Sequence, residues 1–240
     1  MDLENTTPGL VGVSMKRILI IAAHPDDDIL GCGGTIAKQK EMGAEVKVVF
    51  VAEGTSCRFH EVNNPGIEKE LKKRNAAGVN ALASLGVQDY VFCNLPCGRL
   101  DQVPQIEINK ILEREIQIFQ PDTIFTHSAK DTNVDHRIVN ACTRIATRPI
   151  SSAKVQQVFA YEVLSSSEWN FDEVFSPNYF VSLEERHVVA KITALTFYDS
   201  EIHDFPHPRS SEGIKALAQY RGLQCAEMYA EAFQVTRMIN

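Results

Sequence analysis

Two hydrophobic patterns alternate along the chain: short continuous apolar runs, and longer segments with apolar residues at helical spacing. The continuous runs at residues 17–23, 46–52 and 123–126 are typical of strands buried on both faces of a parallel sheet. Helical spacing predicts helices at residues 29–42, 67–85, 105–119 and 138–146. Because a strand, a helix and a second strand follow one another at the start, the pattern predicts a βαβ unit and therefore an α/β fold.

The rest of the chain continues the same alternation. Further strands are expected at residues 90–92 and 155–163, and closing helices at 183–198 and 211–233. Residues 1–14 are polar, contain a Pro-Gly pair and lack periodicity, which predicts a loose tail. No repeat or long linker follows, so we expect a single domain over residues 15–240.

Composition narrows the class of protein. The net charge is −7 and Lys and Arg form no cluster, which argues against a nucleic-acid-binding surface. No apolar segment approaches the ~18 residues of a membrane span, and the start of the chain does not resemble a secretory signal. The six cysteines are scattered without a CxxC pair, which favours reduced thiols. We therefore expect a cytoplasmic protein that does not insert into membranes.

The first apolar run ends in a polar cluster, His24 and Pro25 followed by aspartates at 26–28, and then a glycine-rich turn. In open parallel sheets the carboxyl ends of the strands are where ligands bind. Pro25 fixes a bend that lets His24 and Asp27 turn toward one point, and imidazole nitrogen with carboxylate oxygen suits Zn²⁺ or another divalent transition metal. Asp28 is expected to cap the following helix.

A second polar cluster follows the strand at 123–126 and contains His136, which we predict to be the third ligand. Two histidines and one carboxylate leave a coordination position open for water, as in catalytic zinc sites. Asp26 is then the expected general base. Each cluster alone also fits a structural histidine or a solvated acidic turn, but two clusters at one sheet edge favour a metal. Asp131 and Asp135 are expected to orient the ligands.

Several motifs carry a resemblance to a known family. AHPDD at 23–27 with the following ILGCGGTIAK, and HSAKDTNVDHR at 127–137, resemble the PIG-L/LmbE-like family of zinc-dependent de-N-acetylases. The likeness extends from Lys16 through EGTSCR, RLD at 99–101, PRSSEGIKALAQYRG and YAEAF. It implies a Rossmann-like three-layer sandwich, and one Zn²⁺ per chain held by the residues assigned above. It also implies hydrolysis of an N-acetyl group from an amino sugar or its conjugate, and it fits a trimer or hexamer.

Two positions depart from the family pattern. Asp28 stands where many members carry Glu, and Asn133 stands where relatives often carry a His thought to stabilise the oxyanion or protonate the leaving group. Asn donates a hydrogen bond but cannot carry the proton. Three outcomes stay open: Asn133 acts as a neutral donor, another histidine such as His127 or His207 takes the role, or activity is low.

Further polar residues are candidates for binding the substrate: Arg58, Arg99, Asp101, His127, His207 and Arg209. The guanidinium groups suit substrate oxygens or a phosphate, although a salt bridge explains them equally well. The predicted partner is a small N-acetylated amino sugar or conjugate, nucleotide-linked ones included. The alternatives are a catalytically weak relative that binds a sugar or nucleotide, and a metal-dependent amidohydrolase acting on a non-sugar N-acyl amine.

Overall fold

The computed structural model describes residues 15–61, 64–149 and 154–239, so the predicted tail at 1–14 lies outside the described residues. Its strands form one sheet: β1 (Arg17–Ala22), β2 (Glu45–Ala52), β3 (Asp89–Leu95), β4 (Thr123–His127), β5 (Gln157–Tyr161), β6 (Tyr179–Leu183) and β7 (Tyr229–Met238). The strand order is β3-β2-β1-β4-β5-β7-β6. The five strands from β3 to β5 pair in parallel, whereas β7 is antiparallel to both of its neighbours.

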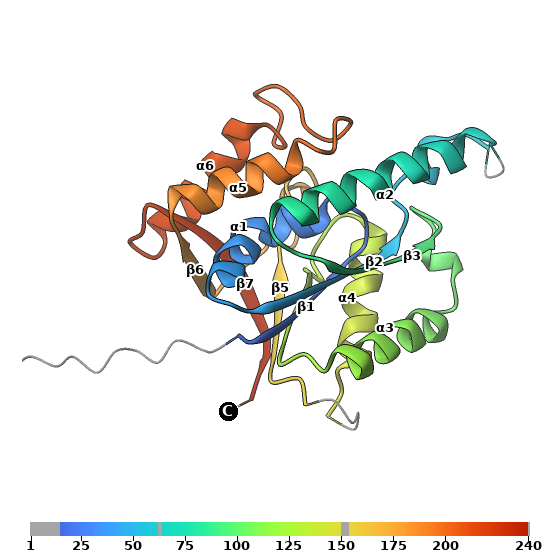
Figure 1. Ribbon diagram of the computed structural model, residues 1–240, viewed down its shortest axis with the longest axis horizontal. Coiled ribbons are helices and arrows are strands. Elements are labelled where there is room, and N and C mark those ends of the chain that lie inside the picture. The colour runs from blue at the N-terminus through green and yellow to red at the C-terminus, as the bar shows by residue number, and fades with distance from the viewer. Residues whose placement is uncertain (1–14, 62–63, 150–153, 240) are drawn as a thin grey trace, which may run out of the picture.

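Helices cover both faces of this sheet (Figure 1). They are α1 (Asp27–Glu41), α2 (Gly66–Ser84), α3 (Gln105–Phe119), α4 (Val134–Ala146), α5 (Glu185–Leu195) and α6 (Ser211–Leu223). Helices α1, α2, α5 and α6 pack on one face, and α3 and α4 pack on the other. The predicted three-layer α/β fold with a mainly parallel sheet is therefore confirmed. Across the described ranges, no helix combines the length and the apolar character that crossing a membrane requires.

The central strand β1 shows why continuous apolar runs become buried strands here. Ile18 and Ile20 belong to the core beneath α1, whereas Leu19 and Ile21 belong to the core beneath α3 and α4. Side chains alternate between the faces of a strand, so a strand covered on both faces must be apolar at every position. β1 accordingly lies inside the sheet between β2 and β4, and its carboxyl end is where the polar clusters lie.

The glycines predicted to form a turn after β1 lie inside α1, and they allow this helix to lie close against the sheet. A Cβ atom built on Gly31 would lie 2.3 Å from Cδ2 of Tyr161, whose ring is fully buried on β5. A real Cβ does not approach a ring carbon so closely, so only glycine fits without moving the ring or the helix. The start of α1, which carries the aspartates, is thereby held against the carboxyl ends of the strands.

The structure corrects the end of the chain. The helix predicted at 211–233 ends at Leu223, and the chain continues as strand β7. The turn is tight, since a Cβ on Gly222 would lie 2.5 Å from the carbonyl oxygen of Glu227. Leu183, predicted to begin a helix, instead ends β6. Aromatic and β-branched residues in 229–238 favour a strand once β5 offers an edge to pair with, and this pairing overrides a helical interpretation.

Candidate active site

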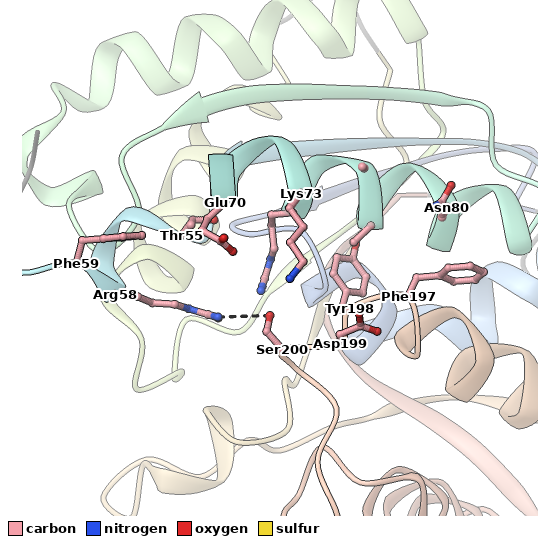
Figure 2. Close-up of a pocket in the computed structure, with 13 residues that line it drawn as sticks. Thr55, Arg58, Phe59, Glu70, Lys73, Asn80, Phe197, Tyr198, Asp199 and Ser200 are labelled. Atoms are coloured by element: carbon pink, nitrogen blue, oxygen red, sulfur yellow. Dashed lines mark hydrogen bonds between the residues drawn. The ribbon is translucent and has the colours of Figure 1, made fainter. Parts of the chain in front are cut away.

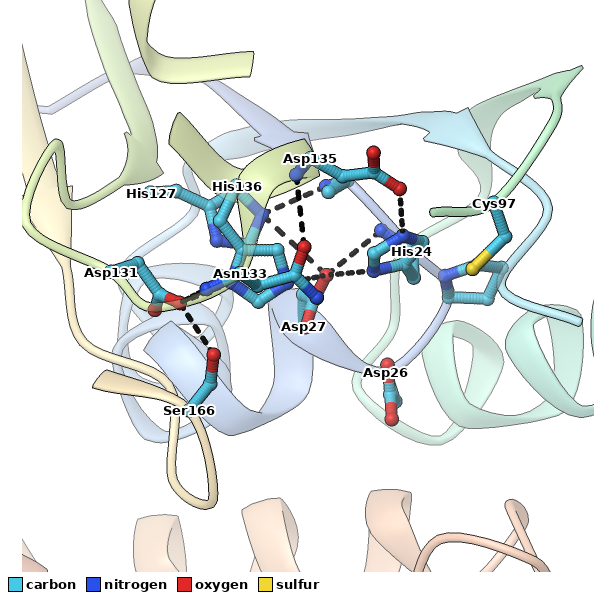
Figure 3. A network of polar contacts seen from close by, with 12 residues as sticks. His24, Asp26, Asp27, Cys97, His127, Asp131, Asn133, Asp135, His136 and Ser166 are labelled. Carbon is cyan, nitrogen blue, oxygen red and sulfur yellow. Dashed lines mark hydrogen bonds and ion pairs between the residues drawn. The ribbon is translucent and has the colours of Figure 1, made fainter. Parts of the chain in front are cut away.

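The two polar clusters meet at one edge of the sheet, at the carboxyl ends of β1 and β4 (Figure 3). His24 is the second residue after β1, and Asp27 begins α1. His136 lies in the first turn of α4, just after the segment that leaves β4. Because β1 and β4 are neighbouring parallel strands, both segments leave the sheet on the same side. The fold therefore places residues more than a hundred positions apart around one point.

His24, Asp27 and His136 form a compact buried group. Nδ1 of His24 lies 3.2 Å and Nε2 of His136 lies 3.3 Å from the same carboxylate oxygen, Oδ2 of Asp27. One donor atom from each residue lies within 4.8 Å of the others. Two imidazole nitrogens and a carboxylate oxygen make a donor set typical of catalytic zinc. The residues present therefore fit a Zn²⁺ ion.

Each histidine of this group has a second carboxylate on its other ring nitrogen. Oδ2 of Asp135 lies 2.9 Å from Nε2 of His24, and Oδ1 of Asp131 lies 3.2 Å from Nδ1 of His136. Burial by itself lowers the pKa of both imidazoles. The surrounding carboxylates outweigh it and raise the pKa of His24 to about 10 and that of His136 to about 9. The carboxylates around the two imidazoles therefore stabilise positive charge at this point, as a cation site requires.

Asp135 also fixes a neighbouring loop. Besides His24, its carboxylate accepts hydrogen bonds from the backbone N–H of Gly98, at 2.6 Å to Oδ2, and of Leu100, at 3.1 Å to Oδ1. Cys97, which precedes this glycine, has its Sγ within 4.8 Å of donor atoms of His24 and Asp135. The orientation of His24 and the position of the loop at 97–100 therefore depend on the same carboxylate.

Asp26, the predicted base, is buried beside the group with an unusual backbone. Its φ angle is +123°, a region that residues other than glycine rarely adopt. Arg74 and Arg209 both contact the same oxygen, Oδ2, at 3.1 and 2.9 Å. Burial raises the pKa of Asp26 to about 6, although the two guanidinium groups act to lower it. Within the described residues, Oδ1 makes no hydrogen bond or ion pair.

The sequence pattern does not single out Arg74 or Glu201, yet both belong to this environment. Arg74 projects from the buried side of α2 and donates from Nε to the carbonyl oxygen of Pro25, at 2.9 Å. The buried Glu201 carboxylate pairs with Arg58, Arg74 and Arg209. These contacts join segments far apart in the chain, and an Arg in a run of lysines gives no signal of its burial. In the sequence, the only signal of this burial is that Arg74 lies at helical spacing from Gly78 and Ala81, on what becomes the buried face of α2.

Asp28 differs from its predicted role. It lies in the first turn of α1, but neither carboxylate oxygen forms a hydrogen bond within the described residues. The residue is fully buried, and burial raises its pKa to about 8. Asp28 is therefore mainly protonated at neutral pH and does not cap the helix through its side chain.

Asn133 is the N-cap of α4. Its Oδ1 accepts a hydrogen bond from the backbone N–H of Asp135 at 2.9 Å, and its own N–H donates to Oδ1 of Asp131 at 2.8 Å. Asp131 is held in turn by the hydroxyl of Ser167, at 2.6 Å, and by that of Ser166. With Oδ1 committed to the cap, the side-chain NH₂ of Asn133 is the part that can face a substrate.

His127 lies behind the group. Its ring is fully buried and stacks on His136 with 4.0 Å between centroids, and Nε2 accepts a hydrogen bond from the N–H of Ala23 at 2.8 Å. Burial, followed by the charge on His136, lowers the pKa of His127 to about 3. The ring is therefore neutral and supports the site from within, where a substrate does not reach it.

The other substrate-side candidates are placed at differing depths. Arg209 forms an ion pair with Asp26 in the site, and the exposed Arg58 forms an ion pair with Glu201. His207 lies on the partly exposed loop before α6, and its Nδ1 accepts a hydrogen bond from the N–H of Arg209 at 3.0 Å. Arg99 lies within the loop that Asp135 holds and Asp101 follows it, and neither side chain makes a hydrogen bond or ion pair with a described residue.

A cavity of about 330 Å³ adjoins the arginines, between α2 and the segment that follows α5 (Figure 2). Arg58, Lys73 and Arg74 contribute positive charge to its lining, and Phe197 and Tyr198 contribute aromatic surface. Arg74 separates this cavity from Asp26, because its guanidinium contacts the aspartate while its side chain lines the cavity. The cavity is therefore a neighbour of the candidate active site.

Comparison with known proteins gives a consistent result. Residues 19–147 match the model of the PIG-L family, described as GlcNAc-PI de-N-acetylase. The chain is 28% identical over 192 residues to the uncharacterized deacetylase YaiS of Escherichia coli strain K12, covering 77% of this chain and 91% of YaiS. It is 22% identical over 232 residues to the diacetylchitobiose deacetylase of Thermococcus kodakarensis, covering 92% of this chain and 83% of that enzyme.

Among solved structures, GalB of Pseudomonas putida KT2440, a 4-carboxy-2-hydroxymuconate hydratase, superposes with a TM-score of 0.73. The identity is 22%, and the superposition covers 92% of this chain and 96% of GalB. At this level of identity the likeness speaks for the fold, and one fold hosts different reactions. The chemistry of this chain therefore depends on its own residues.

Proposed function

Because the chain belongs to the PIG-L (GlcNAc-PI de-N-acetylase) family, we propose that it is a zinc-dependent hydrolase that removes the N-acetyl group from an amino sugar or amino-sugar conjugate. The observation that carries the proposal is the convergence of His24, Asp27 and His136, with Asp26 beside them. The name of the Thermococcus relative, a diacetylchitobiose deacetylase, supports an N-acetylated sugar as the substrate class. Nucleotide-linked amino sugars are included in this class.

A zinc ion held by the three ligands would polarise the acyl oxygen and lower the pKa of a bound water to about 7. Asp26 then takes the proton of the attacking water and returns it to the leaving amine. Both arginines contact Oδ2 of Asp26, which leaves Oδ1 as the oxygen that accepts the proton. A base whose pKa is raised to about 6 is well matched to reaction near neutral pH.

Asn133 takes the place of an acid–base residue as a neutral donor in this proposal. The cap bond from the N–H of Asp135 occupies Oδ1, which directs the amide so that its NH₂ group is available. A neutral donor stabilises an oxyanion without carrying a proton, so Asp26 alone has to supply the proton to the amine. The variant Asn133→His tests this division. A large gain in rate would favour the alternative that the present chain is a catalytically weak relative.

The direct test combines metal analysis with acetate release from N-acetylglucosamine derivatives, free and nucleotide-linked. We expect about one zinc per chain, and we expect His24→Ala and Asp26→Ala to lose at least ~10²-fold in rate. His60→Ala is the control, because this exposed histidine forms no hydrogen bond, ion pair or ring contact with another described residue. A protein without bound metal, or variants that keep full acetate release, would refute the proposal.

Parallel assays separate the substrate classes. N-acetyl amino acids and simple N-acetyl amines should react far more slowly than the sugars, and the opposite ranking would favour the non-sugar amidohydrolase. Association into a trimer or hexamer, the single-domain organisation and the cytoplasmic location stay predictions. Light scattering on the purified protein tests the first of these.

A further inference from the structure

Two thiols approach each other at the rim of the metal group. Cys57 lies on the short helix η1 (Ser56–Arg58) and is exposed, whereas Cys97 is buried in the loop after β3. Their Sγ atoms are 3.1 Å apart. A disulfide bond is about 2.05 Å long, so roughly 1 Å separates the two thiols from bonding distance.

A buried carboxylate holds both loops in place. Oε2 of Glu53 accepts hydrogen bonds from the N–H groups of Thr55, at 2.5 Å, and Ser56, at 2.9 Å, at the start of η1. The other oxygen, Oε1, accepts from the N–H of Cys97 at 2.9 Å. Each loop is thus tied to the same side chain by its backbone. These hydrogen bonds hold the backbone of Cys97 beside the residues that precede Cys57, and so bring the two thiols within reach of each other.

The two thiols differ in reactivity. The hydrogen bond from the Cys97 thiol lowers the pKa of Cys57 to about 6, so the exposed sulfur is largely a thiolate near neutral pH. The same hydrogen bond, followed by burial, raises the pKa of Cys97. The thiolate is the nucleophilic form of cysteine, and the partner thiol next to it can resolve an oxidised product.

We propose that Cys57 and Cys97 form a reversible oxidation site that reacts with hydroperoxides and closes to a disulfide beside the metal group. The Cys57 thiolate attacks one oxygen of the hydroperoxide, forming the sulfenic acid and, with hydrogen peroxide, releasing hydroxide. The Cys97 sulfur then attacks the sulfenic sulfur, the S–S bond forms, and the sulfenic oxygen leaves as water with the thiol proton. The two thiols lose two electrons, and the O–O bond of the peroxide gains them.

Closure of the disulfide acts on the metal ligands through Asp135. Cys97 is followed by Gly98, whose N–H donates to the Asp135 oxygen that also contacts His24. Moving Cys97 toward Cys57 by up to ~1 Å disturbs this shared contact and hence the orientation of His24. Oxidation is therefore expected to weaken metal binding, and reduction by a dithiol to restore it.

The test counts thiols and maps the bond in the purified full-length protein treated with hydrogen peroxide. We expect the loss of two of the six thiols and a Cys57–Cys97 linked peptide by mass spectrometry, both reversed by dithiothreitol. Cys57→Ser should abolish the linked peptide, whereas Cys225→Ser, at a half-buried thiol elsewhere, should retain it. Absence of the linked peptide in the unmodified sequence would overturn the proposal, as would the same two-thiol loss in Cys57→Ser.

A second variant gives an independent readout. In Cys97→Ser the resolving thiol is absent, so dimedone should trap a sulfenic acid on Cys57, and trapping on another cysteine instead would refute the assigned order. Zinc affinity, measured by chelator competition, should fall about tenfold or more on oxidation of the unmodified sequence. Equal affinity of the two forms would overturn the link to His24. The thiol readouts do not depend on any deacetylase activity, so failure of the proposed function would leave them informative.

Discussion

Asp135 offers a sharp test of how the metal group is positioned. Its two oxygens accept hydrogen bonds from three donors, namely Nε2 of His24 and the N–H groups of Gly98 and Leu100. In Asp135→Asn, one oxygen becomes an NH₂ donor. Whichever way the amide is turned, at least one of the three donors then faces another donor in a buried site.

The expected magnitudes follow from this count. A buried donor left without an acceptor costs about 1–3 kcal/mol of stability. Loss of the carboxylate that orients a ligating histidine typically lowers metal affinity ~10–100-fold, which corresponds to about 1.4–2.8 kcal/mol. We therefore expect Asp135→Asn to be destabilised in urea denaturation and, measured by chelator competition, to bind zinc at least about tenfold more weakly.

Asp122→Asn is the matched control. The Asp122 carboxylate also accepts several hydrogen bonds, from the N–H groups of Lys16 and Arg17 and from the hydroxyl of Thr123. It lies at the amino-terminal end of β1, whereas the metal group lies at the carboxyl end. This variant should lose stability and keep its zinc affinity. If Asp135→Asn also keeps full zinc affinity while losing as much stability as the control, the inference that Asp135 orients a metal ligand is wrong.

Three further outcomes are expected. Lys191→Met breaks the buried 2.6 Å pair with Glu231 and should cost ~3–5 kcal/mol in urea denaturation, because the carboxylate is left uncompensated. Gly31→Ala should cost about 1–3 kcal/mol in the same measurement, because the new methyl group overlaps the Tyr161 ring. Alkylation of Cys57 by iodoacetamide should accelerate as pH rises through about 6 and then level off, because the thiolate reacts and forms above its pKa.

Controls exist within the same chain. Lys215 pairs with Glu185 on the surface, so Lys215→Met should change stability little, and an equal loss in both lysine variants would contradict the role of burial. Full stability of Gly31→Ala would show that the ring accommodates a methyl group. Alkylation of Cys225 should lack the low midpoint, because burial raises the pKa of that thiol.

The sequence predicts those parts of the fold that local pattern determines. The helix at 105–119 matches α3 residue for residue, because its apolar spacing and the flanking prolines leave no competing interpretation. Strand β7 is not predictable in this way, because a strand at the end of the chain depends on the free edge of β5 that it pairs with. Helical spacing that continues past Gly222 carries no information about that partner.

In the candidate site, too, some contacts follow from local sequence patterns and others do not. The proximity of His24 and His136 follows from two motifs and one topological rule, that adjacent parallel strands end at the same edge. The contacts of Arg74 and Glu201 with one another join α2 to the segment after α5, and no local pattern encodes them. The functional roles of the predicted ligands and of Asp26 stay predictions until metal binding and catalysis are measured.

The backbone at Asp26 sets stability and catalysis against each other. A glycine adopts φ +123° without strain, whereas a residue with a side chain loses of order 1–3 kcal/mol of stability there. Asp26→Gly would relieve this strain, but it would also remove the buried carboxylate that Arg74 and Arg209 contact, and with it the proposed base. A library of variants screened by melting temperature alone therefore reports the sum of strain and ion pairing at position 26, and only an activity screen reports on the proposed base.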